Sequence, residues 1–508
     1  MKDLSDLKVA VVSGAHAYPA RAPYDPPVDY PELPFRHRPQ DKENGVYPMV
    51  RESLRLLGMD SARFGRSDWN PLGEIISPGE RVLVKPNFVL HFNAGTGPLE
   101  AVVTHASVLR AIADYVLIAL KGHGELSIGD APQMNCDLPT LFQGNGMRDL
   151  ATFLAEVCQT LGTKFSVADF REEQTYYKVG IIWKRRALGR GASQTIPVGL
   201  GPESFMEPIN SRLLYGADYN RRETVQAHQG HRHEYRIASE LLSSDVVISV
   251  PKLKVHSKVG TTLNLKNMVG INTDKNHLAH YRVGPPSVGG DEFSNPRWYD
   301  TLDRRLSDAL LGQFWRWGKY PFVAWRAFRK LWRYVQHPAK DAFTYGNWHG
   351  NDTAWRMALD LNRVVLTADP GGKLANQPVR RYFSFIDGVV GGQGDGPLHP
   401  DAYRSGVILA GFNPVAVDWV ATLLMGFDPS LIPMYSNAVE QMREWVPDFV
   451  VDHIKVCSNT STYQDFLTGN KTLFKFASAP GWRGKIERYM SEAPFEPVIE
   501  MPDLFLRQ

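Results

Sequence analysis

The chain has 508 residues and a formal net charge of +3, with 43% hydrophobic and 22% charged residues. This composition excludes a largely disordered protein, and the nearly balanced charge argues against a nucleic-acid-binding surface spread over the whole molecule. The length predicts more than one structural unit, and no apolar run reaches the roughly 18 residues expected of a membrane-spanning helix.

The cysteines and the N-terminal segment indicate in which cellular compartment the protein resides and which cofactors it can bind. The three cysteines are Cys136, Cys158 and Cys457, and none belongs to a CxxC pair. We therefore expect no cysteine-ligated iron–sulfur cluster built from this chain alone. Sparse cysteines suit a reducing compartment, and the charged start MKDLSDLK does not resemble a signal peptide. A cytoplasmic protein is the expectation.

Short β-branched runs alternate with helical patterns along the chain. Strands are predicted at 9–13, 81–85, 125–128, 245–250, 382–386 and 407–410. Helices are predicted at 49–58, 107–120, 234–242 and 415–425. Strand, helix and strand in succession are typical of parallel strands joined by crossover helices. The predicted fold class is α/β with a mostly parallel sheet.

Two irregular stretches interrupt this pattern. Residues 161–230 are rich in Gly, Arg and polar side chains and predict an inserted subdomain or lid, whereas 296–346 predict an aromatic-rich helical insertion. Packing of these aromatic side chains onto the body is favoured, and contact with a membrane surface or a protein through 300–345 is the alternative. The remaining segments are three parts of the α/β core, at 1–160, 231–295 and 347–470, and a C-terminal tail at 471–508.

Polar side chains follow several of the predicted strands. They occur at Lys85-Pro86-Asn87, Gly129-Asp130, 251–256, Asn351-Asp352 and Asp387-Gly388. In open α/β sheets, ligands bind outside the carboxyl ends of the strands. We therefore expect these segments to line one crevice.

The most basic of these segments is PKLKVHSKVGTTLNLKNMVG, residues 251–270, which contains no acidic residue. In an extended strand Lys252, Lys254 and His256 would point to one face. Ammonium groups suit phosphate or carboxylate ligands, so the segment predicts an anion site that also includes Asn264, Lys266 and Asn267. A solvated basic loop is the alternative.

A glycine-rich segment, DGVVGGQGDGP, covers residues 387–397. Glycines such as Gly394 and Gly396 would allow a ligand to approach the backbone closely. Asp387 and Asp395 could serve as general acid and base, or bind a divalent metal through oxygen. The spacing meets neither nucleotide-binding fingerprint. A glycine-rich turn with capping aspartates is the alternative.

The order of these motifs resembles the DUF362 family. The motifs are VLVKPNFV, VTHASVLRAI, IGDAP, DVVISVPKLKVHSKVGTTLNLKNMVG, FIDGVVGGQGDGP and GFNPVAVD, over roughly residues 80–425. The family is named for a domain of unknown function. Many members carry a ferredoxin-like segment with clustered cysteines, which this chain lacks, so electron transfer is not implied. A looser likeness to nickel-pincer lactate racemases rests on His and Lys residues that follow parallel strands.

These observations predict an enzyme that acts on an anionic small molecule bearing phosphate or carboxylate. The residues expected to bind it are Lys85, Asn87, Lys252, Lys254, Asn264, Lys266, Asn267, Gly394 and Gly396. The expected catalytic residues are His256, Asp387 and Asp395, and the candidate metal ligands are Asp130, Asp387 and Asp395. The alternatives are a non-catalytic binding or scaffold protein and a metal-dependent isomerase or hydrolase with a lactate-racemase-like fold. No nucleic-acid partner is expected.

Overall fold

The computed structural model describes residues 3–33, 40–178, 181–189, 193–216, 220–295, 343–464 and 473–488, with Ala324, Phe328 and Phe466. Nearly all of the aromatic insertion predicted at 296–346, and most of the tail predicted at 471–508, lie outside the described residues. The expectation of a protein or membrane contact through 300–345 therefore stays a prediction.

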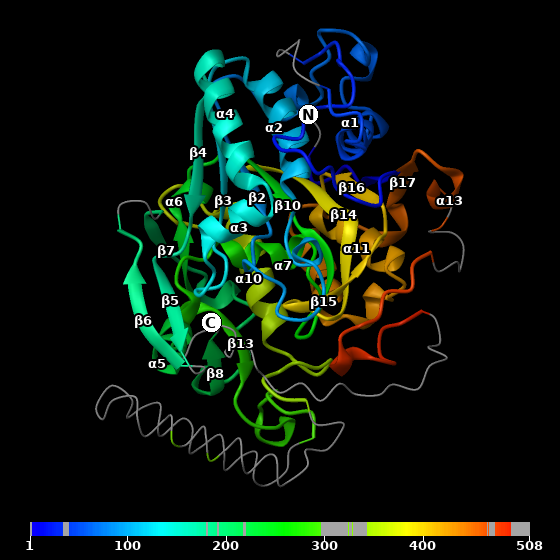
Figure 1. The fold of residues 1–508 in the computed structure, drawn as a ribbon. Coiled ribbons are helices and arrows are strands. Elements are labelled where there is room, and N and C mark those ends of the chain that lie inside the picture. Colours follow the sequence, from blue (N-terminus) through cyan, green and yellow to red (C-terminus); the bar gives the residue numbers. More distant parts are fainter. Residues whose placement is uncertain are drawn as a thin grey trace.

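The described chain is built around one large sheet (Figure 1). Across the sheet the order is β17 (Lys455–Ser458), β1 (Lys8–Ser13), β16 (Val407–Gly411), β14 (Arg381–Asp395), β10 (Val246–Val250), β2 (Arg81–Pro86), β3 (Glu125–Asp130) and β4 (Lys164–Asp169). Two more strands pair with the far half of β14, namely β11 (Lys252–His256) and β15 (His399–Tyr403), and β12 (Gly260–Thr261) pairs with β11.

Most of the strands in this sheet run parallel. β14, β10, β2, β3 and β4 form a continuous parallel series. β16 runs antiparallel to both β14 and β1, so β1 points the same way as β14. The carboxyl ends of these five strands and of β1 therefore point to one edge of the sheet, which confirms the predicted α/β class with a mostly parallel sheet.

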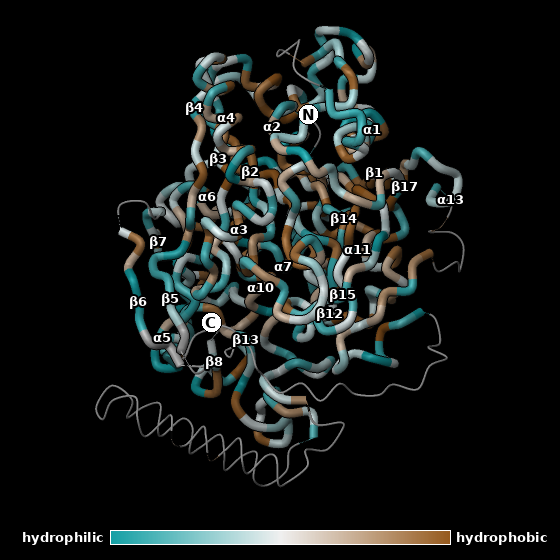
Figure 2. Tube along the Cα trace, in the orientation of Figure 1, coloured by the Kyte–Doolittle hydropathy of each residue, from teal (hydrophilic) through white to brown (hydrophobic). Residues whose placement is uncertain are grey.

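Helices cover both faces of the sheet because alternate strand residues point to opposite sides. Ala10 and Val12 pack into one core with α1 (Val46–Leu56), α2 (Ala106–Leu120) and α4 (Met147–Leu161). Val9 and Val11 pack into the other core with α10 (Ala354–Thr367), α11 (Pro414–Leu424) and α12 (Pro433–Arg443). Figure 2 shows the hydrophobic stretches concentrated on these inner strands and helices. The shorter helices are α3 (Leu138–Gly144), α6 (Ser239–Leu242), α7 (Asn264–Asn267) and α13 (Ser461–Gln464).

Small antiparallel sheets gather beside one edge of the large sheet (Figure 1, lower left). They pair β5 (Glu173–Lys178) with β6 (Ile181–Ala187), β7 (Thr195–Gly199) with β9 (Glu234–Ala238), and β8 (Leu214–Gly216) with β13 (Ala279–Arg282), next to α5 (Arg221–His228). Much of the predicted insertion at 161–230 lies here. Its first strand, β4, instead belongs to the large sheet because it pairs with β3 along its whole length.

The glycine-rich segment is a strand and not the predicted loop. β14 continues through Asp387 to Asp395, flanked by β11 and β15. Its glycines let neighbouring backbone approach: a Cβ on Gly391 would lie 2.9 Å from the Leu253 carbonyl oxygen, and one on Gly392 would lie 2.5 Å from that of Ala101. Close packing of protein backbone therefore accounts for these two glycines without a ligand.

Among the helices that the structure describes, none is both long and apolar enough to cross a lipid bilayer. The cytoplasmic location expected from the sequence stays a prediction.

Candidate functional site

Four of the five segments singled out in the sequence lie at one edge of the sheet because β2, β3, β10 and β14 are parallel, whereas Asn351-Asp352 precedes α10 and directly follows no strand in the described residues. Pro251 links β10 to β11, and β14 is long enough to pair with both strands. Lys252, Lys254 and His256 alternate along β11, as the sequence predicts.

Lys85 and Asp130 form a buried ion pair between the ends of β2 and β3. The Lys85 Nζ lies 2.7 Å from Asp130 Oδ1 and donates to Asn267 Oδ1 at 3.0 Å. The other carboxylate oxygen accepts the Phe88 N–H at 2.6 Å. Burial lowers the pKa of Lys85 and raises that of Asp130, and each charge offsets part of the other's shift. The charge of Lys85 is thus neutralised within the protein.

Lys252 and Asp387 form a second buried pair, 2.8 Å apart. The Tyr18 hydroxyl donates to Asp387 Oδ1 at 2.6 Å and accepts from Lys252 Nζ at 2.7 Å, while the His105 N–H donates to Asp387 Oδ2 at 3.0 Å. The rings of Tyr18 and His105 stack 4.0 Å apart. Burial raises the pKa of Tyr18 and lowers that of His105 to about 3, so both side chains are neutral near pH 7. Asp387 therefore has four polar partners already.

Tyr18 and His105 were not predicted as site residues. Tyr18 follows β1, and β1 runs in the same direction as β14, so the rule that selected the other strand ends applies to it as well. His105 directly precedes α2, and its Nδ1 accepts the Ser107 N–H at 3.2 Å at the start of that helix.

Lys254 has no carboxylate partner in the described part of the chain, although its side chain is 0% exposed. Its Nζ donates to the Val102 carbonyl oxygen at 2.6 Å. Burial lowers its pKa well below the usual value, and repulsion from Lys252 adds to that effect.

Lys254 belongs to a group of six basic side chains, which we name the cationic cluster. Its members are Lys254, His256, Lys258, Lys266, Lys275 and His280. Lys266 is central. Its charge helps to lower the pKa of Lys254, His256 and His280, and the charges of Lys275 and Lys258 help to lower its own pKa. Burial lowers the pKa of Lys266 and of Lys275 to about 7. For Lys275, repulsion from Lys85 and Arg171 adds to the effect of burial, and Asp130 opposes it. Burial lowers the pKa of Lys258 to about 8.

The members of the cluster differ in their hydrogen bonds. Lys258 Nζ donates to the Tyr345 carbonyl oxygen and to Asn347 Oδ1, the latter at 2.9 Å, and Lys275 Nζ donates to the Ala131 carbonyl oxygen at 2.7 Å. Within the described residues, Lys266 Nζ makes no hydrogen bond or ion pair, and the residue is only 7% exposed. Lys266 is thus a buried basic group without an internal partner there.

Asp418 and Asn362 fix the segment that carries Lys266. Asp418, on α11, accepts the backbone N–H groups of Asn264 and Leu265, both at 2.9 Å, and the Asn264 side chain at 2.8 Å. Asn362, on α10, donates to the Leu265 carbonyl oxygen at 2.8 Å. Burial raises the pKa of Asp418 to about 7, although these bonds oppose the shift. Lys266 is therefore presented from a firmly held turn.

The amide side chains predicted to bind substrate make hydrogen bonds within the protein, although Asn87 Oδ1 is buried without a hydrogen-bond partner in the described residues, and their binding role stays a prediction. Asn264 contacts Asp418, and Asn267 contacts Lys85 and also donates to Ser249 Oγ at 3.1 Å. Asn87 donates to Asn267 Oδ1 at 3.3 Å. These contacts hold the two ends of α7, so the asparagines position Lys266.

The three candidate metal ligands lie in separate surroundings. Asp130 pairs with Lys85, Asp387 pairs with Lys252, and Asp395 lies at the end of β14 with its Oδ2 3.4 Å from His399 Nδ1. Over the part of the chain that the structure describes, no three His, Cys, Asp or Glu side chains are grouped to hold a metal ion. The structure does not bring these aspartates together.

The two glycines predicted to contact substrate lie at the end of β14. Gly394 has a φ of 75°, and its N–H donates to the Ala477 carbonyl oxygen at 2.8 Å. A Cβ on Gly396 would lie 2.2 Å from the Val255 carbonyl oxygen, so this glycine lets the chain pass close to β11.

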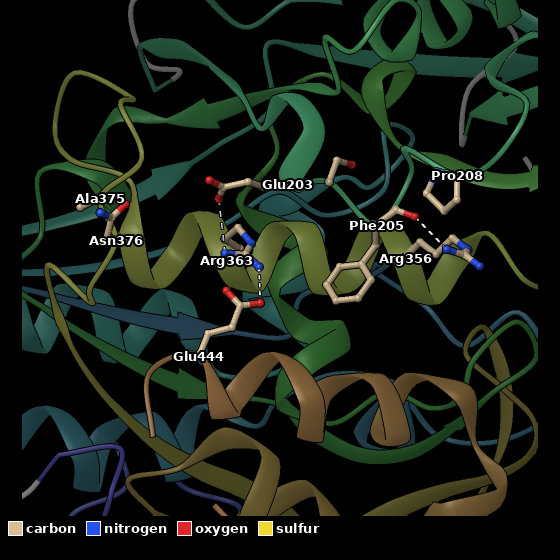
Figure 3. A pocket seen from close by; sticks show the side chains of 9 residues that line it. Glu203, Phe205, Pro208, Arg356, Arg363, Ala375, Asn376 and Glu444 are labelled. Carbon is tan, nitrogen blue, oxygen red and sulfur yellow. Dashed lines mark hydrogen bonds and ion pairs between the residues drawn. The ribbon is translucent and has the colours of Figure 1, made fainter. Parts of the chain in front are cut away.

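A cavity of about 640 Å³ lies elsewhere, between α10, the end of α12 and the segment around Glu203 (Figure 3). Arg363 Nη2 and Nη1 lie 2.6 Å from Glu444 and 3.5 Å from Glu203, and Arg356 Nη1 donates to the Phe205 carbonyl oxygen at 2.8 Å (Figure 3). None of the predicted site residues lines this cavity.

Comparison with known proteins identifies the family. The family model described as "Domain of unknown function (DUF362)" matches residues 82–181 and 203–422, a range that contains the whole cationic cluster. The chain is also similar to the thylakoid-associated protein sll1697 of Synechocystis, with 21% identity over 362 residues that cover 71% of this chain and 68% of that protein. Because the family model covers more than half of the chain, the protein belongs to the DUF362 family.

Proposed function

We propose that the protein is an enzyme that binds a phosphate- or carboxylate-bearing small molecule at the cationic cluster. The observation that carries the proposal is the state of Lys266, which is buried among five other basic side chains and has no internal partner in the described residues. An anion at this position would supply the missing negative charge.

The two ion pairs nearby support this interpretation. Lys85 and Lys252 are equally buried, yet each has a carboxylate oxygen within 2.8 Å. Leaving a buried charge uncompensated costs several kcal/mol, on the order of 3–5 in measured cases. The chain therefore neutralises the lysines that hold its strand ends together, whereas Lys254 has no carboxylate partner in the described residues and Lys266 has no hydrogen-bond or ion-pair partner there.

The proposal assigns separate roles to the predicted residues. Lys254, Lys266 and Lys275 hold the anion, and His256 transfers a proton because burial keeps its imidazole neutral near pH 7. Asp387 acts as a positioning residue through Lys252 and Tyr18. The catalytic role predicted for Asp395 stays a prediction.

Calorimetric titration with inorganic phosphate, malonate and glycerol tests the proposal. We expect the two anions to bind with saturation and glycerol not to bind. The Lys266→Met variant should lose at least about tenfold in affinity, or 1.4 kcal/mol, whereas Lys455→Met, at an exposed position on β17, should bind as the parent does. Failure of both anions to bind, or equal binding by Lys266→Met, would overturn the proposal.

A further inference from the structure

Lys266 differs from the other three lysines of the cationic cluster in what its amine can do. Lys254, Lys258 and Lys275 each donate a hydrogen bond to a fixed oxygen, at 2.6, 2.9 and 2.7 Å for Val102, Asn347 and Ala131. Lys266 Nζ has no such bond in the described residues, and its side chain keeps a small exposed fraction of 7%. It is the cluster's amine that a small molecule could reach without breaking an internal bond.

The surroundings of Lys266 are those that make a lysine nucleophilic. An amine attacks a carbonyl carbon only in its neutral form, and desolvation next to other cationic groups favours that form. Lys266 is buried, and Lys258 and Lys275 both repel its positive charge. A lysine in such surroundings can form a covalent bond to a carbonyl compound.

We infer that Lys266 forms an imine with a small aldehyde or ketone that also carries a carboxylate or phosphate group. This inference rests on the proposed function, because the anionic group would be held by the remaining members of the cluster. It adds the carbonyl group, and hence the substrate class, to that proposal.

The chemistry balances without an oxidant or a metal. The lone pair of Lys266 Nζ attacks the carbonyl carbon and forms the C–N bond, and the carbonyl oxygen becomes a hydroxyl by taking up a proton. The nitrogen then expels this hydroxyl as water, after a further protonation of the oxygen, and the C=N bond forms. Amine and carbonyl compound thus give imine and water. His256, whose pKa is lowered in part by the charge of Lys266, is the group that we assign to carry these protons.

The rigid support of Lys266 favours a covalent role over a merely electrostatic one. Asp418 and Asn362 hold Leu265, the residue before Lys266, and Lys85 and Ser249 hold Asn267, the residue after it. Attack on a carbonyl carbon requires a defined approach, which fixed neighbours on both sides provide. A diffuse attraction for anions would not require this.

Reductive trapping tests the inference on the full chain. The protein is incubated with sodium cyanoborohydride, which reduces imines, and with pyruvate, glycolaldehyde phosphate or acetone, and the modified lysine is located by peptide mass spectrometry. We expect Lys266 to be modified by pyruvate or glycolaldehyde phosphate in preference to every other lysine. Acetone, which lacks the anionic group, should give little product. The label should be absent from Lys266→Arg and unchanged at Lys266 in Lys455→Arg.

The outcomes separate this inference from the proposed function. Saturable phosphate binding without a label on Lys266 from any carbonyl compound would overturn the imine and leave the anion site standing. A label on Lys266 from acetone as strong as that from pyruvate would overturn selection by the anionic group. Modification spread over exposed lysines, with phosphate binding also absent, would overturn both.

Discussion

Lys252 and Lys254 lie two residues apart on β11, and only Lys252 has a carboxylate partner in the described chain. Its Nζ lies 2.8 Å from Asp387 Oδ2, whereas Lys254 Nζ donates at 2.6 Å to the neutral Val102 carbonyl oxygen. The two side chains point to one face of the same strand and are both 0% exposed. The site therefore contains a buried lysine whose charge is compensated by a carboxylate beside a buried lysine that has no such partner in the described chain.

Asp387→Asn should destabilise the protein strongly. It removes the charge that compensates Lys252 and leaves a buried ammonium group unpaired, at a cost of about 3–5 kcal/mol. Urea unfolding measures this change. Asp452→Asn, at an exposed aspartate, is the control and should change stability by less than about 0.5 kcal/mol. Equal stability of the two variants would contradict the assignment of Asp387 to a structural pair.

Lys266→Met should have the opposite effect on the free protein. Removing a buried basic group with no internal partner relieves its desolvation and repulsion, so we expect the free energy of unfolding at pH 7 to rise by about 0.5–2 kcal/mol. Lys252→Met leaves the buried Asp387 carboxylate without its ion-pair partner, so it should lower the free energy of unfolding by about 3–5 kcal/mol. A loss of stability in Lys266→Met would argue that this lysine has a structural partner.

The contribution of Lys266 and Lys275 to the stability of the free protein should rise with pH between about 7 and 10. The usual pKa of lysine is 10.5, and burial lowers that of Lys266 and Lys275 to about 7 in the folded state. Over this window these two lysines bind more protons in the unfolded chain than in the folded one, so their contribution favours folding as the pH rises. Urea unfolding at a series of pH values should show a smaller rise in Lys266→Met than in the parent. Identical pH profiles would show that Lys266 keeps an ordinary pKa.

Anion binding should follow the reverse trend. The ammonium forms of Lys266 and Lys275 are populated below about pH 7, so affinity for an anion should fall as the pH rises from about 6 to about 9. Sulfate is the suitable probe because its own charge stays constant over this range. Calorimetry at constant ionic strength measures the affinity. A dissociation constant that does not change with pH would count against these lysines as the anion ligands.

Gly270→Ala should disturb the Lys85–Asp130 pair. A Cβ at this position would lie 1.9 Å from Asp130 Oδ1 and 2.6 Å from Lys85 Nζ, so the pair would have to move. We expect a loss of about 1–3 kcal/mol in urea unfolding. Gly371→Ala is the matched control, because its nearest contact would be 3.4 Å from Asp369 Oδ1. If both variants were equally stable, the segment after α7 would have room that the structure does not show.

The sequence predicted that Lys85, Asp130, Lys252 and Asp387 lie at one edge of the sheet because parallel strands share an edge at their carboxyl ends, and the structure places them there as two separate ion pairs. It could not predict which lysine pairs with which carboxylate, since that depends on sheet order. The extension of β14 to Asp395 was also missed. A glycine-rich segment is typical of a turn when it is judged from the sequence alone. In the folded protein the backbone of Leu253 and Ala101 packs against Gly391 and Gly392, which accounts for these glycines within a strand.

Other members of the site lacked a local signal. Lys275 and His280 follow the basic segment in an ordinary polar stretch, TDKNHLAHYR, and join the cluster only through folding. Asn264 and Asn267 carry side chains typical of ligand binding, yet their partners are Asp418 and Lys85. Composition alone cannot distinguish an amide that binds substrate from one that holds a turn.

The most direct measurement of the central claim is the location of an anomalously scattering anion. Crystals of the protein soaked with arsenate, a phosphate analogue, should give an anomalous peak with its oxygens within about 3 Å of Lys266 Nζ. The same soak of Lys266→Met should lose that peak. An arsenate bound only away from the cationic cluster, with Lys266 Nζ uncontacted, would contradict the account.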